Sequence, residues 1–421
     1  MRREAATERH LLTCRKTTWE GEGNTVQGMS SNWLGLSSFG LGAAGMFATV
    51  YCTQAILPTL GREFGVGAAQ TGLTISVVVV AMAVGAWIWG PLSDRIGRKR
   101  CLVLSSGLLV APTVGLGLAP SFSVLLLCRL LQGLCMPGLL AVGLNYVQEV
   151  FGDWLGGKAM GCYLSSLVAG GLIGRVGVAL ASEEVGWRLS LGGLALLPSV
   201  AALFMHYALP QSASPAKEQQ KLTAVVRLLG NRALLLATLG GCALFFSFVG
   251  VFSFVTYYLE APPFSLSTAA GSLIFLLWSF GAIGPVAGAI ADRTGWRATL
   301  VGALTASLLA LPLSLVGTLP TIVAALAVLT VGMFSGATAA QIGVATASES
   351  DRGTASAIYY SSYYTCGAVA AYLPGVAWQW WGWPGVTGVA LGVLAPAAGI
   401  LLFAGIVHGQ RQKLYPDHSR R

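Results

Sequence analysis

Two arginines lie inside long apolar stretches of this 421-residue chain, and their chemistry is the first question that the sequence poses. Arg129 lies in the run RLLQG (129–133), and Arg175 lies in the run GGLIGRVG (170–177). A charge inside an apolar segment is costly, about 2.5–3.5 kcal/mol on insertion scales. A guanidinium can repay this cost by binding an anion, or by bonding helix carbonyls and tying helices together. Both interpretations stay open for both arginines.

Other polar side chains are expected at the same depth. At 1.5 Å per residue, both arginines fall about 9–10 Å below the same edge of their apolar stretches. The first apolar stretch brings Tyr51, Cys52 and Gln54 to a similar height. One polar layer in the first half of the chain is therefore predicted to contact a substrate, and its members are Tyr51, Gln54, Arg129, Gln132 and Arg175.

The second half of the chain offers phenols and no buried charge. Tyr359, Tyr360, Tyr363 and Tyr364 follow one another so that residues four apart share a helix face. The hydroxyl groups of phenols in an apolar helix find hydrogen-bond partners most readily when one helix face lines a cavity. Tyr359, Tyr360 and Tyr363 are therefore further candidates for substrate binding. Packing and interfacial anchoring is the alternative. We interpret Trp378, Trp380, Trp381 and Trp383 as an aromatic belt at the membrane surface.

No aspartate or glutamate is expected deep in any apolar stretch. Every acidic residue of the apolar region falls near one of two edges: Asp94, Glu149, Asp153, Asp292, Glu349 and Asp351 at one, and Glu63, Glu183, Glu184 and Glu260 at the other. A midplane carboxylate is the usual proton carrier of membrane pumps. Three options remain: coupling through carboxylates at the edge, coupling carried by the substrate, or no proton coupling.

The elements that hold these residues are predicted from composition and hydropathy. The chain is 55% hydrophobic and 10% charged, whereas soluble domains carry about 25% charged residues, so we expect an all-α membrane protein. Apolar stretches of about 20 residues can span a bilayer as helices. Twelve are predicted: 34–60, 71–92, 101–119, 122–147, 159–181, 189–209, 232–258, 268–291, 298–317, 321–345, 355–376 and 386–408.

A charged loop occurs twice, at nearly one spacing. The first copy is GPLSDRIGRKR (90–100) and the second is GAIADRTGWR (288–297), so that Asp94 and Asp292 are 198 positions apart. The tripeptides GWR (186–188) and GWP (382–384) repeat at an offset of 196. Two pairs at one offset indicate an internal duplication. A basic loop that merely orients the chain in the membrane is the alternative for the first copy.

The first loop resembles the signature of the major facilitator superfamily, G-x-L-x-D-R-x-G-R-K, at every fixed position. Arg129 and Gly133 resemble the family's fourth-helix motif, R-x-x-x-G, in which the arginine is linked to proton coupling. The resemblance implies two pseudo-symmetric bundles of six helices and a secondary transporter. It also implies a set of residues that gate the path: Gly90, Asp94, Arg95, Gly97, Arg98, Glu149, Asp292 and Arg293.

Charge and hydropathy together predict the layout of the chain. We expect a cytoplasmic tail (1–33, where Met29 is an alternative start), an N-terminal bundle (34–209), a cytoplasmic linker (210–231), a C-terminal bundle (232–408) and a second cytoplasmic tail (409–421). With the N-terminus inside, 21 of the 25 cations fall on the cytoplasmic face, as the positive-inside rule requires. Localisation in the inner or plasma membrane is expected.

The function predicted from these features is proton-coupled export of a small amphiphilic or anionic organic solute. Export rests on a resemblance to bacterial efflux permeases of this superfamily, but Arg175 replaces the proline of their antiporter motif. An uptake symporter, a uniporter and a non-transporting receptor on the same fold are alternatives. The residues show no P-loop, metal motif or nucleophile constellation, so we expect no enzyme, cofactor, metal or nucleic-acid partner, and we expect a monomer.

Overall fold

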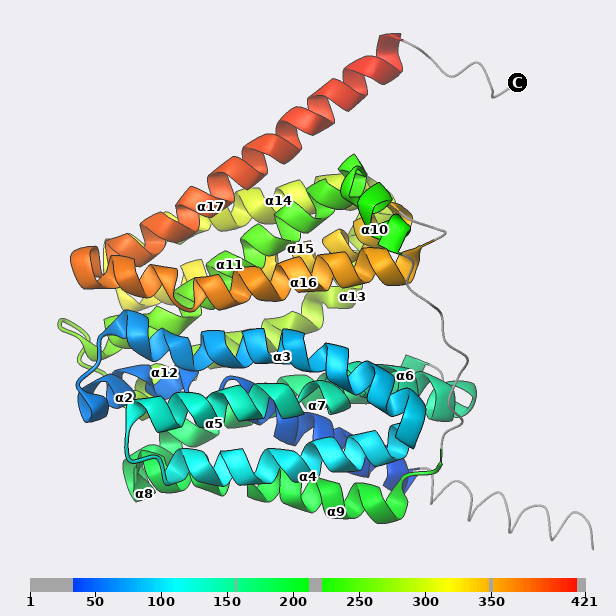
Figure 1. Cartoon of the computed structure of the whole chain (residues 1–421). Coiled ribbons are helices and arrows are strands. Elements are labelled where there is room, and N and C mark those ends of the chain that lie inside the picture. Colours follow the sequence, from blue (N-terminus) through cyan, green and yellow to red (C-terminus); the bar gives the residue numbers. More distant parts are fainter. Residues whose placement is uncertain (1–32, 156, 212–221, 348–350, 415–421) are drawn as a thin grey trace, which may run out of the picture.

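The computed structural model describes residues 33–155, 157–211, 222–347 and 351–414, and over these residues it is helical, with no strand. Long helices run back and forth between two ends of the molecule (Figure 1). We name these ends after a residue at each, the Asp94 end and the Glu260 end. The N-terminal tail, the centre of the linker, Glu349 and the last seven residues, which the sequence analysis assigned to tails or edges, lie outside the described residues.

The helices of the first half lie together, coloured blue to green in Figure 1, and form the N-terminal bundle. Residues 33–50 are its first helix. The other elements are η1 (Gln54–Ile56), α2 (Leu57–Phe64), α3 (Ala68–Ile96), α4 (Arg98–Gly117), α5 (Phe122–Cys135), α6 (Pro137–Leu155), α7 (Gly157–Leu172), the π-helical turn η2 (Ile173–Gly177), α8 (Val178–Gly193) and α9 (Leu196–Ala208).

The helices of the second half, green to red in Figure 1, form the C-terminal bundle. They are α10 (Leu222–Leu229), α11 (Arg232–Glu260), α12 (Thr268–Ser272), η3 (Leu273–Ile283), α13 (Gly284–Thr294), α14 (Trp296–Ala310), η4 (Leu311–Val316), α15 (Leu319–Ala347), α16 (Arg352–Ala370) and α17 (Leu373–Leu414). The linker between the bundles and the boundaries of the five predicted domains stay a prediction.

Ten helices among the described residues are long and apolar enough to cross a membrane. Two of them, Lys158–Ala208 and Gly353–Ala404, are 51 and 52 residues long, about twice the length that a crossing needs. Their backbones leave the helical region at Gly186 (φ 81°) and Gly382 (φ 60°), conformations that glycine adopts readily. The number of twelve crossings stays a prediction.

The internal duplication is visible in the backbone of the two loops. Gly97 has φ 87° and ψ 149°, and Gly295 has φ 86° and ψ 148°. Each ends its helix by donating its N–H to the carbonyl four residues earlier, on Ser93 and Ala291 respectively. The two copies therefore make the same turn, and both loops lie at the Asp94 end because the helices alternate in direction.

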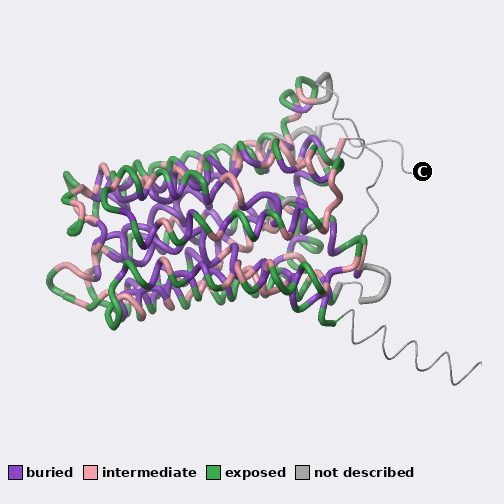
Figure 2. Tube along the Cα trace, turned by 60° about the horizontal axis from the view of Figure 1, so that its bottom comes forward, coloured by how far each residue is buried: buried purple, intermediate pink, exposed green. Residues whose placement is uncertain are grey.

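The flanks of the molecule are apolar, as a lipid-facing surface requires. The exposed residues follow the outside of the helices, while the buried residues fill the interior (Figure 2). Trp87, Trp380 and Phe403 are at least 70% exposed. The predicted aromatic belt is wrong at one position: Trp383 is buried, stacks on Tyr258 and donates its indole N–H to Ser314 Oγ at 3.1 Å.

Candidate functional site

Arg129 is buried inside the N-terminal bundle and all of its nitrogens have acceptors. Its Nε donates to Thr74 O at 2.7 Å, its Nη1 donates to Thr49 O at 2.7 Å and to Gln132 Oε1 at 2.8 Å, and its Nη2 donates to Val50 O. The first helix, α3 and α5 are joined through this one side chain. The helix-tying interpretation accounts for every one of these contacts.

Gln132 extends this network without leaving the bundle. Its amide nitrogen donates to Thr113 Oγ1 on α4 at 2.9 Å, while its amide oxygen accepts from Arg129. Both side chains are fully buried. The structure thus brings Arg129 and Gln132 together, as their spacing in the sequence predicts, but it places them among residues of one bundle.

Arg175 reaches the boundary between the bundles because glycines let its helix approach the first helix closely. A Cβ atom on Gly174 would lie 2.0 Å from Ala48 O, and one on Gly170 would lie 2.1 Å from Ala44 O. Small residues four apart allow such contacts between membrane helices. The π-helical turn η2 then carries Arg175 itself, and π-turns often occur at functional sites.

The guanidinium of Arg175 is enclosed by rings from both bundles. Its Cζ lies 3.6 Å from the ring centre of Trp278 and 5.6 Å from that of Phe275, both on η3, and 4.4 Å from that of Tyr51. Its Nε donates to Gln54 Oε1 and its Nη1 donates to Gly171 O, each at 2.7 Å. Its buried Nη2 has no hydrogen-bond partner.

Gln54 links this cluster to the C-terminal bundle. Its amide nitrogen donates to Ser253 Oγ on α11 at 3.0 Å, while its oxygen accepts from Arg175. Tyr51 meets Trp278 edge-on with ring centres 5.9 Å apart. Three residues of the predicted layer, Tyr51, Gln54 and Arg175, therefore lie where the two bundles touch.

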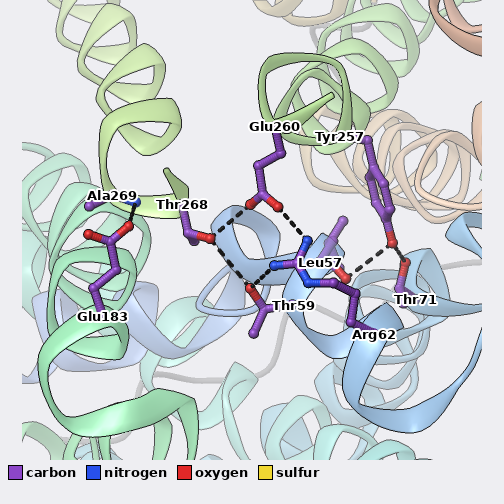
Figure 3. Close-up of polar contacts among 9 residues, drawn as sticks. All are labelled: Leu57, Thr59, Arg62, Thr71, Glu183, Tyr257, Glu260, Thr268 and Ala269. Carbon is purple, nitrogen blue, oxygen red and sulfur yellow. Dashed lines mark hydrogen bonds and ion pairs between the residues drawn. The ribbon is translucent and has the colours of Figure 1, made fainter. Parts of the chain in front are cut away.

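The Glu260 end is closed by a polar network that crosses between the bundles (Figure 3). Arg62 on α2 donates to Glu260 on α11 at 2.7 Å. The other carboxylate oxygen of Glu260 accepts from the Thr268 hydroxyl at 2.8 Å, and Thr59 lies 3.4 Å from that hydroxyl. Arg62 also donates to Thr59 at 3.2 Å. Each bundle contributes two members of this network.

Two further side chains, Tyr257 and Glu183, make contacts across the same boundary. The Tyr257 hydroxyl lies 2.8 Å from Thr71 Oγ1 and donates to Leu57 O at 3.1 Å. The carboxylate of Glu183, on α8, accepts the backbone N–H of Ala269 in α12 at 2.7 Å. Both are drawn in Figure 3. Hydroxyl, carboxylate and backbone groups thus hold one end of the bundles together.

At the Asp94 end the predicted gating residues are placed within their own bundles. Arg98 forms an ion pair with Glu149, and the side chain of Asp153 lies outside the described residues. Seven of the eight gating candidates, all except Glu149, lie in the two loops. The side chains of Asp94, Arg95, Asp292 and Arg293 are exposed, and a Cβ atom on Gly90 would meet nothing beyond its local backbone within 4 Å. Asp94 is therefore accessible in this structure.

The phenols of α16 form one aromatic group. Tyr359 and Tyr363 have ring centres 5.5 Å apart, and Tyr360 and Tyr364 have ring centres 6.2 Å apart, as the spacing of four predicts. Tyr363 stacks on Phe245 of α11 at 3.8 Å. Tyr359 is buried with an unpaired hydroxyl, whereas Tyr360 is 41% exposed. Packing against Phe245 accounts for the buried position of Tyr363. Tyr360 is the most accessible of the three candidates.

Sequence reasoning missed the partners from the second half of the chain. Trp278 and Ser253 complete the Arg175 cluster, and Glu260 completes the network at the other end. One signal was available: Arg62 and Glu260 are 198 positions apart, as are Asp94 and Asp292. The two members of this ion pair are therefore equivalent positions of the internal repeat.

Comparisons with known proteins agree with this architecture. The family profile described as Major Facilitator Superfamily matches residues 39–350. The chain is 30% identical to the Bacillus subtilis protein named Uncharacterized MFS-type transporter YybF, over 84% of this chain and 89% of that protein. It is 31% identical to the Escherichia coli Inner membrane transport protein YnfM, over 83% of this chain and 85% of that protein.

Solved structures share the fold. A bacterial homologue of the human lysosomal transporter Spinster, in an inward-facing and occupied conformation, superposes with a TM-score of 0.72 at 15% identity, covering 88% of this chain and 96% of that one. This likeness agrees with the two bundles, and the family match and the relatives decide the class. The chain belongs to the major facilitator superfamily, a family of multi-pass membrane transporters of small solutes, and it is not an enzyme.

Proposed function

We propose that this protein is a secondary active transporter that moves a small organic solute by alternating access, and that the described structure is a state closed at the Glu260 end. The bundles would rock about their contact so that the solute site opens to one membrane face and then to the other. Twelve membrane crossings and two cytoplasmic termini are part of this proposal.

The observation that carries the proposal is the position of the contacts between the bundles. Arg62 and Glu260 are 198 positions apart, Gln54 and Ser253 are 199 apart, and Leu57 and Tyr257 are 200 apart. The first contact therefore joins equivalent positions of the two repeats, and the other two join positions that lie within two residues of equivalence. Equivalent positions meet at the pseudo-two-fold axis that relates the bundles, and the axis is where a rocking motion opens or closes one end.

The energies suit a gate that must open. Arg62 is 64% exposed and Glu260 is 12% exposed, so the pair resembles a surface ion pair, which contributes roughly 0.2–1 kcal/mol. The hydrogen bonds made by Glu183 and Tyr257 each add about 0.5–1.5 kcal/mol. A network of this size favours closure without preventing opening, because thermal motion and substrate binding can supply a few kcal/mol.

The direction of transport and its coupling to protons are further parts of the proposal. Export against a proton gradient rests on the resemblance to efflux permeases, and uptake by a symporter or uniporter is the alternative. The acidic side chains of the described spans lie toward the two ends, with Glu183 and Glu260 bonded across the bundles. A transported proton would therefore bind at these ends, where carboxylates change partners as the bundles move.

A charge exchange tests the gate without knowledge of the substrate. We expect Arg62→Glu and Glu260→Arg each to open the Glu260 end, and the double variant to close it again. The readout is the rate at which a membrane-impermeant maleimide labels Thr256→Cys, a buried position on α11, in a background without accessible native cysteines. Loss of one surface pair changes a population up to about five-fold, so a two- to five-fold faster rate is expected.

The ion pair of Arg188 with Glu63 is the matched control. It lies at the same end and is also solvent-exposed, with a distance of 2.5 Å, but both residues belong to the N-terminal bundle. Reversing these two charges should leave the labelling rate unchanged. Equal labelling rates in all variants would contradict the proposed gate. A double variant of Arg62 and Glu260 that is labelled as fast as the single variants would contradict it too.

A further inference from the structure

Arg175 is a buried charge that its surroundings compensate only in part. The side chain is fully buried, and among the described residues no carboxylate forms an ion pair with it. Two neutral oxygens and three ring faces surround it, and its Nη2 lacks a partner. A buried donor that lacks a partner is rare in folded proteins and calls for an explanation.

The comparison with Arg129 shows that the fold can saturate a buried guanidinium. Arg129 lies against the same segment, residues 49–54, and all three of its nitrogens donate hydrogen bonds. Its acceptors all belong to the N-terminal bundle. Arg175 instead faces Trp278 and Phe275 of the C-terminal bundle, which move relative to it in any rocking motion. Of the two buried guanidinium groups, the one with an unpaired nitrogen is thus the one at the moving boundary.

We propose that Arg175 is the counter-ion of the transported solute, and that its Nη2 binds a carboxylate of that solute once Trp278 has moved off the guanidinium. This proposal rests on the proposed transport function and names its substrate class. In the described state the aromatic rings stabilise the charge through cation–π contacts. When the bundles separate, that cover is lost, and an anion that enters the open site replaces it.

The chemistry of the cluster restricts the solute further. The guanidinium carries one positive charge and has one unpaired nitrogen, so one negative charge is matched, and a second would stay unpaired in an apolar site. The surrounding side chains, Tyr51, Phe248, Phe275 and Trp278, offer apolar ring surface. The expected solute is a monocarboxylate with an apolar, preferably aromatic, body. A cationic drug would meet an uncompensated like charge.

Matched pairs of acids and amides test this inference. The probes are benzoate with benzamide and 3-phenylpropionate with 3-phenylpropanamide, titrated against the purified full-length protein while tryptophan fluorescence and thermal unfolding are recorded. We expect an acid to bind at least ten-fold more tightly than its amide in the wild type. In Arg175→Gln the acid should bind about ten- to a hundred-fold more weakly and the amide unchanged, so that the preference disappears.

Two variants separate charge recognition from general damage. Arg175→Lys keeps the charge and should keep a preference for the acid, whereas Arg188→Gln removes a surface cation and should bind both probes as the wild type does. In Trp278→Phe the fluorescence response to the acid should be lost while the thermal shift remains. No preference for an acid in the wild type, or an equal preference in Arg175→Gln, overturns the inference.

The outcome is distinguishable from failure of the proposed function. The maleimide experiment on Arg62 and Glu260 uses no ligand, so it can succeed while the acid preference is absent. In that case the gate stands and the substrate class is wrong. If the gate fails and Arg175→Gln still abolishes the acid preference, the anion site stands in a protein that does not open at the Glu260 end.

Discussion

The two buried arginines carry the same charge and differ in what surrounds them. Arg129 is satisfied by carbonyls and an amide of one bundle, whereas Arg175 sits under rings of the other bundle with one nitrogen unpaired. The first arrangement holds helices together. In the second, the contacts between the guanidinium and the rings change when the bundles move. Stability should therefore depend on Arg129 and solute recognition on Arg175.

We expect Arg129→Met to destabilise the protein severely. The substitution strands Gln132 and three carbonyl oxygens in the interior, and each unsatisfied group costs about 1–3 kcal/mol. Thermal unfolding in detergent and the yield of folded protein measure this effect. Arg175→Gln should unfold closer to the wild type, because it removes a charge that is only partly satisfied. An Arg129 variant as stable as the wild type would argue against its structural role.

The sequence predicted the depth of these residues and could not predict their lateral positions. Counting 1.5 Å per residue placed both arginines level with residues 51–54, and the structure does place both against that segment. The rotation of each helix depends on close contacts such as Gly174 with Ala48, which only the folded structure shows. Trp278 and Ser253 were missed for the same reason.

At the scale of elements, one close approach between the bundles depends on a glycine, which has no side chain. Gly72 on α3 lies so near the end of α16 that a Cβ atom there would be 1.8 Å from Ala371 O. This contact lies at the Glu260 end, close to the bond from Ser76 to Ala368 O at 2.6 Å. Helices that meet through glycine can approach backbone to backbone.

We therefore expect Gly72→Ala to prevent full closure of the Glu260 end. Overpacking costs about 1–3 kcal/mol, and the bundles can avoid it by staying apart, so the open population should rise by an order of magnitude. Faster maleimide labelling of Thr256→Cys measures the change. Gly107→Ala is the control, because a Cβ atom on this α4 glycine meets nothing within 4 Å. Equal labelling of both variants would contradict the role of this contact.

Hydropathy predicted the existence and order of the apolar helices better than their boundaries and contacts. The predicted stretch 232–258 corresponds to α11, Arg232–Glu260, and the predicted stretch 71–92 lies inside α3, Ala68–Ile96. The helices extend beyond the apolar residues because polar ends can continue a helix into the membrane surface. Trp383 was assigned to the surface since composition cannot separate an interfacial tryptophan from one that finds a buried partner.

At the scale of the whole molecule, the duplication determines where the two gates lie. Equivalent positions of the repeats meet at the Glu260 end, and equivalent loops with matching glycines lie at the Asp94 end. The sequence predicted both loops and the superfamily fold, because a charged turn between apolar helices is a local signal. The contacts between the bundles depend on conformational state, which no local signal records.

Asp94→Asn tests the gate at the other end. When the Asp94 end closes, we expect Asp94 to meet the N-terminus of α16 near Thr354, where a negative charge is stabilised by roughly 0.3–1 kcal/mol. The variant should insert and fold normally while transport falls. Glu184→Gln, an exposed carboxylate at the Glu260 end, should transport as the wild type does. Transport at the wild-type rate by Asp94→Asn would contradict a role for the contact between Asp94 and α16 in closure.

The central claim is that the two ends open alternately, and a pair of spin-label distances tests it most directly. One pair, on Glu184 and Thr318, spans the bundles at the Glu260 end; the other, on Arg100 and Ala298, spans them at the Asp94 end, and all four positions are exposed. On introducing Arg62→Glu, the first distance should lengthen while the second shortens. Distances that stay fixed, or that change in the same direction, would contradict the account.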